Sequence, residues 1–295
     1  MGGADRGGGL GHPSTDAIRG AFRQDGLPRR RPGDPCLEGR IREREDHLRL
    51  RNGARDRRRP QRRVSEPATS VSTDDVASWE GARKLVEQAV AEFGGLDVVV
   101  NNAGILRDAF LAGMTESQWD AVIAVHLKGH AAMLHHAGAY WKQQSKAGNR
   151  PSAAVVNTAS ASGTTLPNAG QANYGAAKAA IAALTLVAAE EFGRYGVRVN
   201  AIAPIARTRL TLATPGMGAM LAAEAEQLGA DEFDAFSPAN ISPLVAYLAS
   251  DECVTTGKVF AVQGGAISEL SVRHDVKTIE AEGPWLIDDI AARLP

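Results

Sequence analysis

AAVVNTASASG, at residues 153–163, joins a short apolar run to a small polar stretch rich in alanine and serine. An apolar run of this length that ends in small polar residues and a glycine predicts a buried strand followed by a loop. Ser160 then lies at the carboxyl end of that strand, where open α/β sheets keep their binding sites. This stretch therefore predicts an α/β sheet with a polar site at its edge.

Tyr174 and Lys178 stand four residues apart in the downstream segment NYGAAK. On a helix this spacing puts both side chains on one face, so the ammonium would hold the phenol near its anionic form. The reference pKa of a phenol is about 10, and a neighbouring cation brings it toward the range of a useful proton donor and acceptor. Because such a pair also occurs by chance, its weight comes from the predicted strand and loop before it.

Strands and helices alternate from Val71 onward, which predicts a parallel sheet covered by helices on both faces, a doubly wound, Rossmann-like fold. We expect the segment 205–240 to be mobile. The expected strands span 96–100, 153–158, 197–202 and 259–262. The expected helices span 79–93, a segment opening with a capping box at 115–118, the segment holding Tyr174, and a segment starting at Ser242-Pro243.

Four segments resemble the short-chain dehydrogenase/reductase family, in the family's order, between residues 68 and 270. They are the turn NNAG at 101–104 after the strand-like LDVVV, the loop around Ser160, the segment NYGAAK, and residues 200–208. Within the family the nearest likeness is to the hydroxyacyl-CoA dehydrogenase unit of the type 2 peroxisomal multifunctional enzyme and its bacterial relatives. It rests on VHLKG at 125–129, GQANY at 170–174 and KVFAV at 258–262.

The resemblance implies a catalytic site in which Ser160 and Tyr174 hold the oxygen of a carbonyl or secondary alcohol while a nicotinamide exchanges hydride with its carbon. It implies that Lys178 also binds the nicotinamide ribose. Most members carry Asn in place of His126, whose backbone carbonyl is expected to hold a water of the proton relay. Two departures are Ile205, where glycine usually follows the proline, and one extra residue between Gly163 and Gly170.

The resemblance also implies where the cofactor would bind. We expect NAD, with NADP open, because the discriminating residue normally follows a strand that this chain lacks. The implied substrate is a 3-hydroxyacyl or 3-oxoacyl thioester of fatty acid metabolism, with a steroid or polyol as the alternative, and the implied assembly is a homodimer or homotetramer. Besides Tyr174 and Lys178, the implied cofactor contacts are Asp75, Val76, Asn102, Ala103, Gly104, Pro204 and Thr208.

Residues 1–66 do not match the family, whose members open with a β-α-β unit carrying a glycine-rich phosphate loop. This segment holds seventeen Arg, no Lys and ten Asp or Glu, with no run typical of a buried strand. It is interpreted either as a frame-shifted product of a GC-rich gene or as a natural disordered arm. The expected organisation is this segment, a dehydrogenase domain over 67–270 with its N-terminal β-α-β unit missing or replaced, and an extension over 271–295.

Composition narrows the class of protein. The formal net charge of −1 combines +7 on residues 1–66 with −8 on the rest, so the catalytic part is not expected to bind nucleic acid. Cys36 and Cys253 are too few for a disulfide framework, and His126 and His130 lack a third metal ligand. With neither a signal peptide nor an apolar run of about 20 residues, we expect a cytoplasmic protein without a membrane or metal.

Two classes of function stay open. The first is an NAD(P)-dependent oxidoreductase acting on CH–OH. The second is a cofactor-less pseudoenzyme or scaffold, because loss of the first strand would leave the strand at 96–100 with an unpaired edge and no phosphate cradle. Plainer alternatives also stand for single residues: Tyr174 as a core aromatic, Ser160 as a turn residue, and Asn101 as a turn former.

Overall fold

A computed structural model describes residues 69–271 except 150, 215, 230 and 231. The predictions for residues 1–66 and 272–295 lie outside the described residues. A five-stranded sheet has the order β1-β2-β3-β4-β5, and its first four strands pair in parallel. The strands are β1 (Val98–Asn101), β2 (Ala153–Thr158), β3 (Val197–Pro204), β4 (Val259–Gln263) and β5 (Ala266–Leu270).

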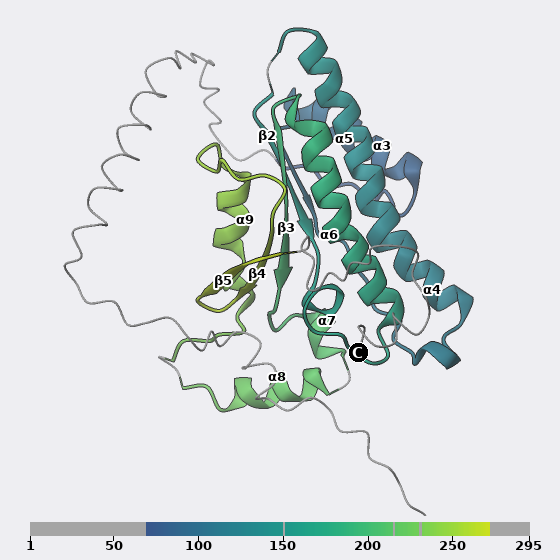
Figure 1. The fold of residues 1–295 in the computed structure, drawn as a ribbon, viewed down its shortest axis with the longest axis vertical. Helices are drawn as coiled ribbons and strands as arrows, with labels where there is room; N and C mark the ends of the chain where they lie inside the picture. Colours follow the sequence, from purple (N-terminus) through teal and green to yellow (C-terminus); the bar gives the residue numbers. More distant parts are fainter. Residues whose placement is uncertain (1–68, 150, 215, 230–231, 272–295) are drawn as a thin grey trace, which may run out of the picture. The chain divides into compact units, whose positions relative to one another are not determined.

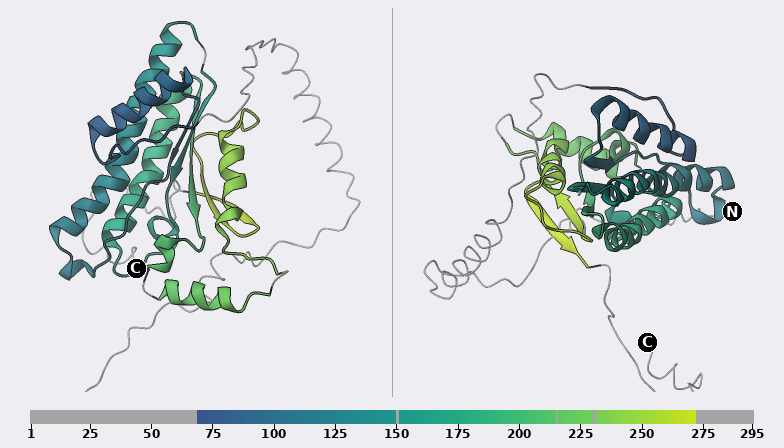
Figure 2. Two further views of the ribbon diagram at one scale, coloured as in Figure 1. Left: turned by 180° about the vertical axis from the view of Figure 1, so that it is seen from behind. Right: turned by 90° about the horizontal axis from the view of Figure 1, so that it is seen from above.

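Helices cover both faces of this sheet, as Figure 1 and Figure 2 show, so the expected doubly wound α/β fold is confirmed. One face carries α3 (Trp79–Phe93), α5 (Gly129–Lys146) and α6 (Ala172–Gly193), and the other carries α9 (Ser242–Ala249). The shorter helices are α4 (Glu116–Ile123), α7 (Arg209–Leu212), α8 (Met217–Glu226), the 3₁₀ turns η1 (Leu111–Gly113), η3 (Ala161–Gly163) and η4 (Pro238–Asn240), and the π-turn η2 (Ala124–Lys128).

β2 is the centre of the core because every one of its residues is buried. Val155 packs with the α3, α5 and α6 side, whereas Val156 packs with Leu244 and Leu248 of α9. This alternation follows from the two-residue period of a strand. A sheet packed on both faces explains why the strand is uninterrupted by polar residues until Asn157.

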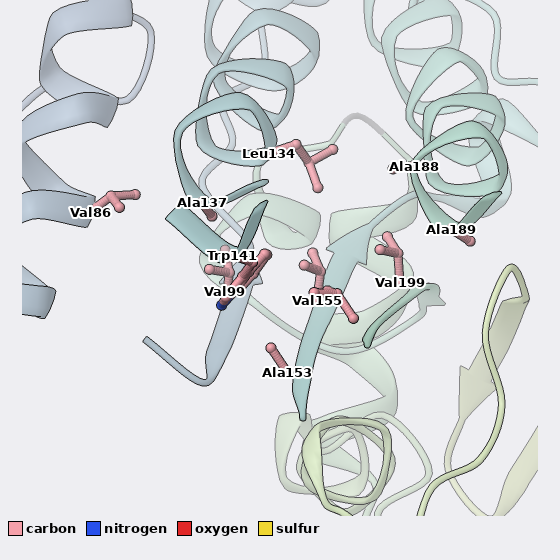
Figure 3. Packing of buried hydrophobic residues seen from close by; sticks show 11 residues of the cluster. Val86, Val99, Leu134, Ala137, Trp141, Ala153, Val155, Ala188, Ala189 and Val199 are labelled. Carbon is pink, nitrogen blue, oxygen red and sulfur yellow. The ribbon is translucent and has the colours of Figure 1, made fainter. Parts of the chain in front are cut away.

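Trp141 anchors α5 to the edge of the sheet (Figure 3). The indole is fully buried beside Val99, and its Nε1 donates to the carbonyl oxygen of Leu96 at 2.7 Å. A buried tryptophan contributes a large apolar surface and satisfies its single donor in this way. The contact fixes how α5 enters the layer beneath β1.

A chain of buried amides ties the strands to α6. Asn101 Nδ2 donates to Asn157 Oδ1 at 2.9 Å, and Asn157 Nδ2 donates to Thr185 Oγ1 at 2.9 Å. The Thr185 hydroxyl in turn donates to the Ile181 carbonyl at 2.8 Å. Each of the buried side chains Asn101, Asn157 and Thr185 therefore has a hydrogen-bond partner. Asn101 serves the sheet here, which favours its structural alternative.

β5 runs antiparallel to β4 and was not expected. Gly264 and Gly265 are the only residues between the two strands, and Gly264 has a φ of 53°. A two-residue connection allows only an antiparallel partner, because a parallel one needs a long crossover. The segment 205–240, expected to be mobile, contains α7 and α8 and an ion pair between Arg207 and Asp234.

β1 pairs only with β2 within the described part of the chain. Val98 and Val100, on the side chain face opposite to Val99, are 38% and 47% exposed. The described residues thus leave one edge and one face of β1 without a partner.

α6 is the one helix among the described residues that is long and apolar enough to cross a membrane. Its apolar side chains have another use, because Ile181, Ala182, Ala188 and Ala189 are buried against the sheet. A core helix that is covered on much of its surface passes the same test of length and composition.

Candidate active site

Ser160, Tyr174, Lys178 and His126 lie together beyond the carboxyl end of β2. The Ser160 side chain lies near enough to Tyr174 to lower the pKa of its hydroxyl, and Lys178 Nζ lies 5.5 Å from the centroid of the Tyr174 ring. The His126 ring meets the Tyr174 ring edge-on, with 5.2 Å between centroids. The first two turns of α6 carry the tyrosine and lysine, and the loop after β2 carries the serine.

The Ser160 loop is fixed by local contacts. Ser160 Oγ accepts the Ser162 N–H at 3.2 Å, and the Ser160 carbonyl accepts the Thr164 hydroxyl at 3.0 Å. Gly163 lies so close to α6 that a Cβ there would stand 2.4 Å from the backbone nitrogen of Ala179. The glycine therefore allows the loop to press Ser160 against the helix that holds Tyr174.

The pKa of Tyr174 shifts in the direction opposite to the one expected from the sequence. Burial raises the pKa of Tyr174, the Asp108 charge raises it further, and only the hydrogen bond from Ser160 lowers it. The expected lowering by Lys178 is absent from these causes. Burial is the largest cause, because transferring a phenolate out of water is costly.

Lys178 is itself buried, with only 2% of its surface exposed. Its Nζ donates to the carbonyl oxygen of Thr158 at 2.6 Å. Burial lowers the pKa of Lys178 to about 7. The lysine therefore gives up its proton more readily than an exposed lysine, which suits a group that exchanges protons with its surroundings.

The His126 side chain contacts the backbone that follows the NNAG turn. Its Nε2 lies 3.0 Å from the backbone nitrogen and 2.8 Å from the carbonyl oxygen of Ile105, so the ring clamps the residue after the NNAG turn. Burial lowers the pKa of His126 to about 4, and its buried Nδ1 has no hydrogen-bond partner. A Cβ on residue 104 would stand 2.6 Å from His126 Cε1, so the imidazole can occupy this position because residue 104 is glycine.

A polar network beside the site was missed in the sequence. Gln171 Nε2 donates to Asp108 Oδ2 at 2.9 Å, Ser162 Oγ donates to Gln171 Oε1 at 3.2 Å, and Asn168 Nδ2 donates to Ser162 Oγ at 2.9 Å. Asp108 Oδ1 is buried without a partner. In the sequence the only signal for Gln171 is its place in GQANY, a stretch matched to the family. The network itself could not be predicted, because its contacts join loops far apart in the chain.

The expected cofactor contacts divide into two groups. Those for the nicotinamide end lie around the site: Pro204 ends β3, and Thr208 caps α7 through Thr211. The turn after β1 holds three more of the expected contacts, of which Gly104 was expected on the adenosine side: Asn102 Oδ1 accepts the Thr158 hydroxyl at 3.1 Å, and Ala103 and Gly104 beside it are exposed.

The contacts for the adenosine end are less complete. Asp75 and Val76 lie just before α3, where Asp75 Oδ1 accepts the Ala77 N–H at 2.9 Å. Within residues 69–271 no glycine-rich turn leads from a strand into a helix beside β1. The described residues thus lack the usual pyrophosphate cradle. Nor do they hold a group of three or more potential metal ligands.

Known proteins resemble the chain over most of its length. Residues 50–266 match the family described as Enoyl-(Acyl carrier protein) reductase. The hydroxyacyl-CoA dehydrogenase ChsB1 of Mycobacterium tuberculosis is 42% identical over 224 residues, which are 75% of this chain and 68% of that protein. The peroxisomal hydratase-dehydrogenase-epimerase of Saccharomyces cerevisiae is 37% identical over 193 residues, 65% of this chain and 19% of that protein.

Solved structures agree with this likeness. A short chain dehydrogenase from Mycobacterium avium is 46% identical and superimposes with a TM-score of 0.66. The match covers 76% of this chain and 71% of that one.

Proposed function

The chain belongs to the short-chain dehydrogenase/reductase family, and from that premise we propose that it is a nicotinamide-dependent dehydrogenase of 3-hydroxyacyl thioesters. As a member of this family it is an oxidoreductase that acts on CH–OH groups. The observation that carries the proposal is the gathering of Ser160, Tyr174 and Lys178 at the carboxyl edge of the sheet. The name of the relative from Mycobacterium tuberculosis supports the acyl thioester.

Ser160 and Tyr174 orient the substrate oxygen through their two hydroxyls. In the reductive direction the Tyr174 phenol donates its proton to the ketone oxygen as the carbon receives a hydride. In the oxidative direction Tyr174 must first lose its proton before the phenolate takes the proton of the alcohol. NAD, when bound, supplies the hydride acceptor. Because burial raises the pKa of Tyr174, the phenol is protonated in the empty site and ready to donate to a ketone oxygen.

Lys178, whose Nζ lies 5.5 Å from the Tyr174 ring centroid, supports this proton transfer. Its Nζ would bind the nicotinamide ribose, and Pro204 and Thr208 would contact the nicotinamide end, with Thr208 on the carboxamide. Its lowered pKa, about 7, lets it pass a proton on at neutral pH. We propose NAD in preference to NADP, on the likeness to hydroxyacyl-CoA dehydrogenases.

The test is turnover of a panel of substrates by the purified full chain. The panel holds 3-hydroxyacyl-CoA esters of several chain lengths, a hydroxysteroid and a polyol, each with NAD⁺ and with NADP⁺, followed by absorbance at 340 nm. We expect NADH formation with a 3-hydroxyacyl-CoA and its loss in Ser160→Ala. Turnover of the steroid or polyol without turnover of any thioester would reject the thioester and keep the reaction type.

A second candidate is a scaffold that does not bind nucleotide. It is favoured by β1, which pairs with β2 alone in the part of the chain that the structure describes, and by the exposed Val98 and Val100. Titration with NADH, followed by its fluorescence, separates the two candidates. Saturable binding excludes the scaffold, whereas no binding up to millimolar NADH excludes the dehydrogenase. We further propose a cytoplasmic homodimer or homotetramer, which light scattering and fractionation would test.

A further inference from the structure

Asn173 directly precedes Tyr174 in the first turn of α6, and it is fully buried. In the sequence it is only one member of the matched stretch GQANY. A buried side-chain amide has to find partners for two N–H hydrogens and for one carbonyl oxygen. The partners that Asn173 finds therefore show what its side chain does.

The oxygen of this amide serves the backbone of Tyr174. Asn173 Oδ1 accepts the Tyr174 N–H at 2.7 Å. The N–H groups in the first turn of a helix have no partner within the helix, and a side chain at the N-cap usually accepts one of them. The N-cap residue Gln171 forms no such bond, and its side-chain nitrogen donates to Asp108 Oδ2. Asn173 thus supplies an acceptor for the residue whose phenol is proposed to donate the proton.

The nitrogen of the amide reaches two segments that are far away in the chain. Asn173 Nδ2 donates to the carbonyl oxygen of Arg107 at 3.0 Å and to that of Gln118 at 3.1 Å. Arg107 lies in the loop that follows the NNAG turn, and Gln118 lies in α4. Backbone carbonyls can only accept and the Tyr174 N–H can only donate, so these partners fix which way the amide points. One side chain therefore joins the backbone of Tyr174 to this loop and to α4.

A backbone contact ties the same loop to the segment before α6. The Ala109 N–H donates to the carbonyl oxygen of Gly170 at 2.9 Å. Gly170 lies outside the helix, whereas Asn173 adds a contact from within its first turn. Loss of the two Nδ2 hydrogen bonds should therefore loosen the loop over residues 105–109 from α6 and move the Tyr174 phenol relative to the NNAG turn.

We propose that Asn173 is a positioning residue: its two Nδ2 hydrogen bonds hold the start of α6 against α4 and the loop after the NNAG turn, and so set the position of the Tyr174 phenol. The structural part of this inference is independent of the reaction. Its kinetic consequence rests on the proposed dehydrogenase function.

The test compares Asn173→Asp with Asn173→Ala. Aspartate keeps the shape of the side chain and the oxygen that accepts the Tyr174 N–H, but it turns the donor into an oxygen that faces two carbonyls. Alanine removes all three hydrogen bonds. The exposed Asn149 supplies the matched control Asn149→Asp, which makes the same change of charge. All variants are measured as the full chain, well below the melting temperature of each, after circular dichroism confirms that each is folded.

The first readout is hydrogen exchange of two backbone amides, which needs no activity. The Ala109 N–H should exchange roughly tenfold faster or more in both Asn173 variants, because the loop is released from α6. The Tyr174 N–H should exchange faster in Asn173→Ala than in Asn173→Asp, which keeps its acceptor. Asn149→Asp should match the wild type at both amides. Wild-type exchange of the Ala109 N–H in Asn173→Asp would overturn the proposal.

The second readout is kinetic. We expect Asn173→Asp to lower kcat by roughly tenfold or more and to leave KM for the acyl thioester nearly unchanged, because the phenol is displaced while the substrate pocket stays intact. Burial raises the pKa of the new carboxylate, and its protonation restores one donor. The kcat of Asn173→Asp relative to wild type should therefore rise as the pH is lowered from about 8 to about 6. Asn173→Ala has no group to protonate, so its relative kcat should stay constant.

Two kinetic results would overturn the proposal. The first is a wild-type kcat in folded Asn173→Asp, since a purely structural role would change only stability. The second is an equal and pH-independent loss of kcat in both Asn173 variants, which would exclude the two donor bonds as the cause. If the wild type turns over no substrate of the panel, the dehydrogenase proposal fails and the exchange readout alone decides this one.

Discussion

Lys178 Nζ and the carbonyl oxygen of Thr158 lie 2.6 Å apart in a site that solvent barely reaches. The ammonium is therefore held by a neutral dipole and forms no ion pair with a carboxylate of the described residues. Such a contact satisfies a donor without compensating the full cost of burying a charge. This explains why the pKa of Lys178 falls to about 7.

Removing this lysine should change how stability depends on pH. Because the pKa of Lys178 falls from 10.5 to about 7 on folding, the unfolded chain binds one more proton between these values. Wild-type stability should therefore rise from pH 7.5 to 9.5, by at most about 1.4 kcal/mol per pH unit from this group. In Lys178→Met that rise should shrink, as read from urea unfolding midpoints. The exposed Lys142→Met is the control, and equal rises in both variants would contradict the burial argument.

Acid should destabilise the fold through two histidines. The pKa values of His126 and His130 fall to about 4 and about 3, mainly by burial, from 6.5. The unfolded chain then binds two more protons than the folded one below pH 6.5, so stability should decline from pH 6.5 toward pH 4. The double variant His126→Asn, His130→Gln should decline less steeply in urea titrations at pH 6.5, 5.5 and 4.5. A slope identical to that of His135→Gln would show that these rings are not protonated on unfolding.

The Tyr174 hydroxyl should be needed for turnover and not for folding. Tyr174→Phe keeps the edge-on ring contact with His126 and removes only the proton donor. We expect kcat to fall by about 100-fold or more, with the melting temperature within a few degrees of wild type. Tyr247→Phe, on α9 and 47% exposed, is the matched control. Unchanged turnover in Tyr174→Phe would remove the phenol from the mechanism.

Gly163 should be intolerant of a single methyl group. A Cβ there would lie 2.4 Å from Ala179 N and 2.7 Å from the carbonyl carbon of Lys178, so the Ser160 loop must move away from α6. We expect Gly163→Ala to lose about 1–3 kcal/mol of stability and most of its activity. Gly113→Ala, whose Cβ meets nothing within 4 Å, should retain both. Thermal unfolding and initial rates measure the difference, and matching behaviour of the two variants would refute the close packing.

Several elements could be predicted because their signals are local. The helix over 79–93 and the strand over 153–158 have the predicted bounds, and the capping box at Thr115 forms with both of its hydrogen bonds. Apolar periodicity and caps depend on a few neighbouring residues. The antiparallel β5 and the π-turn at 124–128 have no comparable local signal, because pairing and packing with distant segments stabilise them.

The sequence by itself determined the α/β fold, the order of its elements and the gathering of Ser160, Tyr174 and Lys178, because strand and helix periods dictate which side chains share a face and an edge. Only the tertiary structure decided the protonation of the site. Burial raises the pKa of Tyr174 and lowers that of Lys178. The Lys178 ammonium, expected to act on the phenol, donates a hydrogen bond to the Thr158 carbonyl oxygen. Desolvation and backbone contacts depend on what surrounds a group in space, and residue spacing along the chain carries no measure of either.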